Sequence, residues 1–373
     1  MYIKATSVFF CIGLVLLSSS FLSCSRNEQD SKDLYIQADN LSKNGEYGKA
    51  KELLKKAIEK SPDFSEGLYA LGDLYYRQGN LDTAILLLEK SIEITPNNFD
   101  ALNKLANSYN KKEQFDKAIT GYEAAIKLRP DSILTYNNLA GAYISKGDLD
   151  KGITTYQKVV GMLKNYSPDY TRELLPDAYY NTANALARKR DYKSAINTYN
   201  AAISLRPVFP EAFYYMGLTY YNNNEREKAQ LCFESAIAQK PDYRIAFHDL
   251  GVIMNQKGDS AAGCNYLGLA TSLGGQYNEA ITLFEKSISK NPKSVEPYYN
   301  AGLTYALTGN TQKAIEYFTK ATVLQPNFPD AYINLQALYQ KIGNKEKSEA
   351  AAKMAIKTTA NAQNKQSKSG FKY

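Results

Sequence analysis

Side chains that commonly perform catalysis or bind metals are scarce in this chain. Its single histidine is His248, and its four cysteines are Cys11, Cys24, Cys232 and Cys264. No group of His, Cys, Asp and Glu has the spacing of a metal site, and the sequence holds no glycine-rich phosphate loop, nucleophile elbow or pair of catalytic carboxylates. We therefore expect a binding protein without enzymatic activity, cofactor or metal, in which His248 packs or contacts a partner.

Two of the cysteines, Cys232 and Cys264, fall on predicted helices. In an oxidising compartment they are candidates for a disulfide. As buried free thiols they would instead fill small apolar places in helix packing. The sequence leaves both alternatives open.

The helices that must position any binding residues belong to a repeat, and its clearest copy is residues 295–328. Apolar residues recur there in steps of three and four, the period of an amphipathic helix, on both sides of a turn at Gly309-Asn310. The unit is therefore a helical hairpin. Its large and small residues follow in the order Tyr298, Ala301, Gly302, Tyr305, Gly309, Ala314, Phe318, Ala321 and Pro326.

The first large residue of each copy recurs along the chain, mostly in steps of 34 residues. It falls at Leu34, Leu68, Leu102, Tyr136, Tyr179, Phe213, Phe247, Cys264, Tyr298 and Tyr332. The small residue that opens the second helix keeps the same period from Ala50 to Ser348, and so does the closing proline from Pro62 to Pro326. These marks predict nine full repeats and one half repeat.

This length and this order of residues resemble the tetratricopeptide repeat, which has 34 residues. The resemblance implies an all-α protein, a right-handed superhelical solenoid of helical hairpins. Small residues such as Gly72 and Gly302 let the two helices of a hairpin approach closely, and proline ends the second helix because it cannot continue one. Since no hairpin buries its apolar face alone, neighbouring hairpins share one continuous core.

Two steps break the period. A step of 43 residues follows the fourth repeat, so we expect an insertion at residues 167–175, with a longer helix and a loop that has Tyr166 and Tyr170 at its tip. A step of 17 residues leaves a single helix near residues 258–275, which must serve two neighbours at once. We expect a kink or hinge there, between a first block at 31–260 and a second block at 261–362.

Residues 1–24 have the layout of a secretory signal peptide, with a basic residue, a short apolar run and small residues. Ser23-Cys24 resembles the end of the bacterial lipoprotein cleavage box, and the resemblance implies lipidation at Cys24 and a place in the bacterial envelope, at the outer membrane or facing the periplasm. An uncleaved anchor or a plain secretory signal is the alternative. Residues 25–30 are expected to form a tether and residues 363–373 a disordered tail.

In the tetratricopeptide family the first helices line a concave groove that binds partners, and the resemblance carries this role to the outward places of those helices. Tyrosine offers contact area at little entropic cost, and asparagine pairs with a peptide backbone. These residues are Tyr35, Tyr69, Asp73, Tyr76, Asn103, Asn107, Asn110, Asn137, Tyr180, Asn184, Tyr214, Tyr221, His248 and Tyr299. Asn138, Asn181, Asn300 and Asn334 recur at one place of the repeat, which resembles the asparagine ladder of the O-GlcNAc transferase superhelix.

We therefore expect a non-enzymatic scaffold or assembly factor of the bacterial envelope that binds partner peptides. The net charge of +7 is mild for 373 residues, and an exported protein meets no nucleic acid. An alternative is a periplasmic adaptor for cell-wall glycan or exported polysaccharide, because a tyrosine-rich surface also stacks on sugars.

Overall fold

The computed structural model describes residues 27–165 and 168–369. Within these ranges all regular secondary structure is α-helical, in 19 helices that pair as hairpins. We call the first helix of each hairpin the A helix and the second the B helix. The fold expected from the repeat pattern is confirmed.

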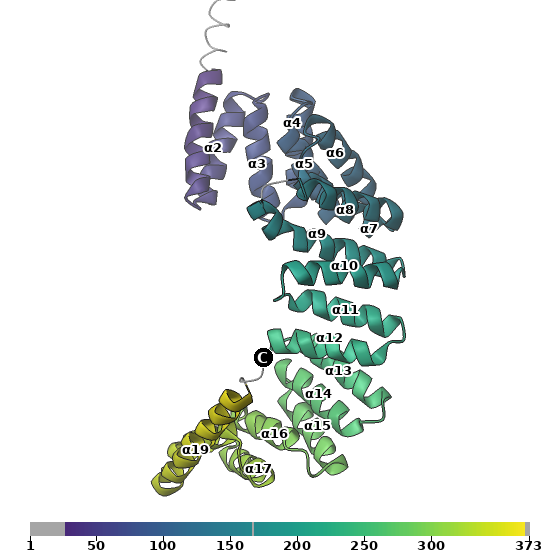
Figure 1. Cartoon of the computed structure of the whole chain (residues 1–373). Coiled ribbons are helices and arrows are strands. Elements are labelled where there is room, and N and C mark those ends of the chain that lie inside the picture. The colour runs from purple at the N-terminus through teal and green to yellow at the C-terminus, as the bar shows by residue number, and fades with distance from the viewer. Residues whose placement is uncertain (1–26, 166–167, 370–373) are drawn as a thin grey trace, which may run out of the picture. The chain divides into compact units, whose positions relative to one another are not determined.

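The chain divides into two compact units, Met1–Asp191 and Tyr192–Tyr373. Figure 1 labels the helices in chain order. In the first unit, A and B helices alternate as residues 27–43, α2 (Tyr47–Lys60), α3 (Ser65–Arg77), α4 (Leu81–Ile94), α5 (Phe99–Lys111), α6 (Phe115–Leu128), α7 (Ile133–Lys146), α8 (Leu149–Leu163) and α9 (Pro168–Arg188).

The second unit begins with a B helix. Its helices are α10 (Tyr192–Leu205), α11 (Pro210–Asn222), α12 (Arg226–Gln239), α13 (Arg244–Gln256), α14 (Ser260–Leu273), α15 (Tyr277–Lys290), α16 (Glu296–Leu307), α17 (Thr311–Leu324), α18 (Pro329–Lys341) and α19 (Lys345–Ser369). Each compact unit builds its core from the packed faces of consecutive hairpins.

Small residues let the helices of a hairpin touch. A Cβ atom built at Gly72 of α3 would lie 2.9 Å from Leu88 Cγ of α4, and one at Gly302 of α16 would lie 2.9 Å from Phe318 Cδ1 of α17. Real Cβ atoms do not approach other atoms so closely. The large residue of the B helix thus occupies the space that the glycine leaves open.

Helix α14 takes part in two hairpins, which is how the chain accommodates the half repeat. Towards α13, a Cβ atom at Gly251 would lie 2.8 Å from Leu267 Cγ of α14. Towards α15, one at Gly268 of α14 would lie 2.6 Å from Phe284 Cε1. Leu267 therefore acts as the large residue of a B helix, and Gly268 as the small residue of an A helix. The expectation that one helix serves both neighbours is confirmed.

The division into compact units falls after Asp191, and the expected block boundary between residues 260 and 261 stays a prediction. At that boundary α13 and α14 pack closely through Gly251 and Leu267. A hinge at residues 258–275 stays a prediction.

The insertion lengthens an A helix, as the step of 43 residues predicts. Pro176 lies inside α9, at the place of the repeat where Pro210 opens α11 and Pro329 opens α18. About two helical turns therefore precede the usual start of the helix. Thr171 fixes them to α8, because its Oγ1 donates a hydrogen bond to the Leu163 carbonyl at 2.7 Å.

The predicted loop is therefore wrong from residue 168 onward. Tyr170 lies within α9, and Tyr166 lies outside the described residues. The stretch Arg172–Leu175 contains good helix formers, and the buried Leu175 packs in a core cluster with residues of α7 and α8. Local propensity and packing thus both favour a helix here.

The ends of the array are more helical than expected. Residues 27–30 of the expected tether already belong to the first helix, and α19 continues through residues 363–369 of the expected tail. Lysine and glutamine, which together fill four of the seven positions 363–369, have high helix propensity. Residues 1–24 with Cys24, and the last residues of the tail, 370–373, lie outside the described residues.

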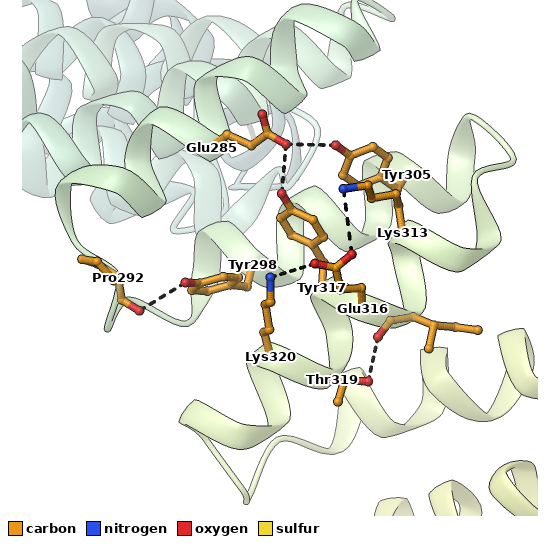
Figure 2. Close-up of polar contacts among 10 residues, drawn as sticks. Glu285, Pro292, Tyr298, Tyr305, Lys313, Glu316, Tyr317, Thr319 and Lys320 are labelled. Carbon is orange, nitrogen blue, oxygen red and sulfur yellow. Dashed lines mark hydrogen bonds and ion pairs between the residues drawn. The ribbon is translucent and has the colours of Figure 1, made fainter.

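A hydrogen bond from tyrosine to glutamate ties consecutive repeats together. It joins Tyr109 to Glu89, Tyr143 to Glu123 (2.6 Å) and Tyr305 to Glu285 (3.0 Å), each pair 20 residues apart. Figure 2 shows that Glu285 of α15 also accepts a bond from Tyr317 of α17, at 2.9 Å. Burial, and then this bond, raises the pKa of Tyr317. The phenol therefore remains a donor to the charged carboxylate, which makes the bond stronger than one between neutral groups.

Both helical cysteines are free and buried. Burial raises the pKa of the Cys232 thiol to about 12, so it stays protonated and packs as a small apolar side chain. The structure therefore has free thiols at Cys232 and Cys264, and not a disulfide between them. Among the described residues, no helix is both long and apolar enough to cross a membrane.

Candidate functional site

The predicted binding residues share three places on the A helices, one, five and eight residues after the first large residue of each repeat. We call the surface formed by these places and by the residues next to them on the A helices, within each unit, the A-helix surface. Tyr214 is buried and His248 is exposed, and the other twelve of the fourteen predicted residues are half-buried. Such side chains are held by the fold and still accessible to a partner.

At the start of the first unit, Tyr35, Tyr69 and Asp73 line one cavity of about 340 Å³ together with Lys43 and Arg77. Arg77 Nε lies 2.6 Å from an oxygen of Asp73. Burial, and then the charge of Asp73, raises the pKa of Tyr69 to about 12. The structure therefore brings three predicted residues together in a cavity with charges of both signs.

The next A helix, α5, adds lysines around Tyr76. Lys104 Nζ lies 2.6 Å from Asp73 Oδ1 and 4.9 Å from the centre of the Tyr76 ring. Lys111 Nζ lies 4.2 Å from the centre of the same ring. Within the described chain Lys111 has no ion pair, because Asn107 stands in α5 at the place that Asp73 holds in α3. This part of the surface is therefore locally basic.

Asn107 connects three helices. Its Oδ1 accepts hydrogen bonds from Tyr122 Oη of α6 at 2.6 Å and from Asn138 Nδ2 of α7 at 3.2 Å. In contrast, Asn103 Oδ1 and Asn110 Oδ1 are buried and have no hydrogen-bond partner in the described part of the chain. A buried acceptor without a donor costs about 1–3 kcal/mol, so these two oxygens lower the stability of this part of the array.

The recurring asparagines join neighbouring A helices. Besides the contact between Asn138 and Asn107, Asn181 Nδ2 donates to Asn137 Oδ1 at 3.3 Å and Asn300 Nδ2 donates to Asn265 Oδ1 at 3.0 Å. Asn334 Nδ2 donates in the same way to Tyr299 Oη at 3.3 Å. We call these contacts the amide row.

In the second unit, Tyr214 is buried. Only 7% of it is exposed, and its hydroxyl donates to Asp249 Oδ2 at 2.8 Å. Its ring packs on those of Phe233 and Tyr243 in the core. Tyr214 therefore holds Asp249 from the core, and a direct contact of Tyr214 with a partner stays a prediction.

The residues around Asp249 are accessible. His248 Nδ1 lies 2.9 Å from Asp249 Oδ1, and the His248 side chain is 60% exposed. Tyr221 and Asp249 line a small cavity of about 100 Å³, and Gln256 Nε2 donates to Tyr221 Oη at 2.8 Å. His248 and Tyr221 are thus available to a ligand.

The remaining predicted residues, Tyr180 and Asn184, lie half-buried on α9. Across the described ranges, no group of three or more His, Cys, Asp or Glu side chains is placed to hold a metal ion.

Sequence reasoning missed the basic residues of the A-helix surface. Lys43, Arg77 and Lys111 follow one another at 34-residue steps, so the period contained the signal that would have found them. Lys104 stands where other repeats carry the asparagine of the amide row, and only the structure shows its contacts with Asp73 and Tyr76.

The fold and this surface define a protein of the helical-repeat class with a row of polar side chains along its A helices. Models of the tetratricopeptide repeat match residues 41–109, 106–147, 134–163, 183–224, 211–243, 268–309 and 295–328. The chain is therefore a tetratricopeptide repeat protein, a family whose members act as protein–protein interaction scaffolds. No curated protein matches it.

Solved structures of such proteins are similar to this chain. A tetratricopeptide repeat protein from Parabacteroides merdae is 16% identical with a TM-score of 0.52, over 74% of this chain and 99% of that one. YrrB, a TPR protein with an unusual peptide-binding site, is 21% identical with a TM-score of 0.43, over 52% and 96%. PilW, a type IV pilus biogenesis factor, is 18% identical with a TM-score of 0.49, over 59% and 97%. At these identities the likeness shows the fold alone.

Proposed function

We propose that this protein is a non-enzymatic scaffold that binds an extended segment of a partner protein along the A-helix surface. The amide row carries the proposal. In the contacts of Asn181 with Asn137 and of Asn300 with Asn265, one amide hydrogen meets one amide oxygen. Since each amide has two donors and an oxygen with two lone pairs, each pair keeps groups for the N–H and C=O of a peptide.

The basic residues of the first unit support a preference within that segment. Lys43 Nζ lies 2.7 Å from Asp39 Oδ2, and Arg77 Nε lies 2.6 Å from Asp73 Oδ2. Each of these two basic groups therefore forms an ion pair. Lys111 lies over the Tyr76 ring and has no ion pair in the described part of the chain. An acidic side chain of the partner would supply the missing opposite charge, so binding should weaken with salt.

A peptide display selection tests this function. We expect the purified protein to enrich peptides whose affinity falls about two- to tenfold in the variant Asn138→Ala, since a hydrogen bond contributes about 0.5–1.5 kcal/mol. Lys90→Ala on the B helix α4 is the matched control and should bind as the wild type does. If no peptide is enriched while cell-wall glycan fragments bind, the surface is that of a glycan adaptor and the proposal fails.

We place this scaffold in the bacterial envelope, exported and held by a lipid on Cys24. The order of a basic residue, a short apolar run and Ser23-Cys24 in residues 1–24 supports this location. We expect palmitate labelling of the wild-type protein in cells and its loss in Cys24→Ser. Labelling that persists in the variant would contradict the lipid anchor and favour a plain secretory signal or an uncleaved anchor.

A further inference from the structure

A cavity of about 290 Å³ lies in the first unit between α7, α8 and α9. Its lining is mostly apolar, with Ile133, Val159, Leu163 and Ala178 buried in the walls. Leu134 is 65% exposed although it lines the same cavity. An exposed leucine beside a buried apolar wall leaves surface that another apolar group would cover favourably.

The insertion builds one wall of this cavity. Leu174 lies in the helical turns of α9 that precede Pro176, and those turns have no counterpart in α11 or α18, which start at their prolines. The hydrogen bond from Thr171 to the Leu163 carbonyl holds them on α8. Leu174 packs against the core cluster of α7, α8 and α9. The wall formed by Leu174 is therefore absent from the repeats of α11 and α18, and contacts with α8 hold it in place.

The rim of the cavity belongs to the amide row. Asn137 and Asn181 line it, and their mutual hydrogen bond of 3.3 Å uses one hydrogen of Asn181 and the oxygen of Asn137. The amide hydrogens of Asn137 and the oxygen of Asn181 make no other hydrogen bond in the described residues. A donor and an acceptor thus stand beside an apolar cavity, the complement of one peptide group followed by an apolar side chain.

We infer that this cavity, which we call the insertion pocket, anchors one large aliphatic or aromatic side chain of the partner segment, while Asn137 and Asn181 pair with the adjacent peptide group. The inference rests on the proposed peptide-binding function and adds which kind of partner side chain the surface recognises. The volume is at the lower end of small-molecule sites, about 300–1,000 Å³, so it suits a single side chain. Because Asn137 and Asn181 of the amide row line the cavity, a side chain in the cavity would lie next to the backbone that these asparagines bind.

The test repeats the display selection with the wild type and with Leu134→Gln, a change at an exposed position that leaves the core intact. The wild type should enrich peptides with a fixed Leu, Ile, Met or Phe, and these peptides should bind Leu134→Gln about tenfold more weakly. Leu86→Gln on α4 is the matched control, because Leu86 is 66% exposed and lies on a B helix. It should bind as the wild type does, and all three proteins should unfold at the same temperature.

The outcomes separate this inference from the proposed function. Enriched peptides without a fixed apolar residue, or with equal affinity for wild type and Leu134→Gln, would overturn the insertion pocket and leave the scaffold standing. Failure to enrich any peptide would overturn both. A wild-type dimer that Leu134→Gln converts to a monomer in sedimentation would also overturn the inference, since a second copy would then cover Leu134.

Discussion

Replacing Phe284 by alanine should lower the free energy of unfolding by about 3–5 kcal/mol, as for other buried phenylalanines. The side chain is fully buried, and it packs with Ala280, Ala301 and Tyr317 from α15, α16 and α17. It also fills the space beside Gly268 of α14. Truncation would open a cavity at the point where the half repeat joins the repeats that follow.

Urea unfolding followed by circular dichroism measures this effect, and hydrogen exchange of α14–α16 locates it, because repeat arrays open locally. Leu86→Ala is the control: Leu86 is 66% exposed, so the change should stay within about 0.5 kcal/mol. Equal stability of Phe284→Ala and Leu86→Ala would contradict the close packing of α14 on α15.

Replacing glycine by alanine should lower the free energy of unfolding at one helical position and raise it at another. At Gly251 of α13 the new Cβ atom would lie 2.8 Å from Leu267 Cγ and 3.0 Å from both Gly263 O and Leu267 N. Two of these are backbone atoms of α14 and cannot move aside, so we expect a loss of about 1–3 kcal/mol from overpacking. At Gly161 of α8 nothing lies within 4 Å, and alanine should stabilise by about 0.5–1 kcal/mol.

Thermal unfolding of the two variants beside the wild type checks this pair. Both variants add the same methyl group. The difference between their unfolding temperatures therefore reports the space around each glycine. A Gly251→Ala protein as stable as Gly161→Ala would show that α13 and α14 do not form a hairpin-like contact.

The repeat could be predicted from sequence because its marks are contact residues whose spacing the packing enforces. Gly302 and Phe318 must meet across a hairpin, so their separation recurs wherever a hairpin recurs. The two contacts of α14 follow the same spacing. Leu267 is the large residue of a B helix and meets Gly251, while Gly268 is the small residue of an A helix and meets Phe284.

The place of the insertion could be predicted from the step of 43 residues, but its helical conformation at Tyr170 and part of the site could not, since they depend on contacts that have no period. Pro176 looks like a helix start, and only the packing of the preceding turns on α8 through Thr171 shows that α9 begins earlier. Tyr214 holds the same place in its repeat as Tyr299, and each ring packs on two aromatic rings. The Tyr214 hydroxyl donates to Asp249, whereas the Tyr299 hydroxyl accepts from Asn334, and Tyr214 is buried while Tyr299 is half-buried. Period alone fixes a place on the helix, while the neighbours decide whether that place is buried.

In-cell photo-crosslinking tests the central claim, that partners bind on the A-helix surface, most directly. Photoreactive residues at Lys111 and at His248 would probe that surface in each unit, because both side chains are exposed. One at the exposed Lys90 of the B helix α4 is the control. We predict a protein adduct, identified by mass spectrometry, from Lys111 or His248 and none from Lys90. Adducts from Lys90 alone, or equal adducts from all three positions, would contradict the claim.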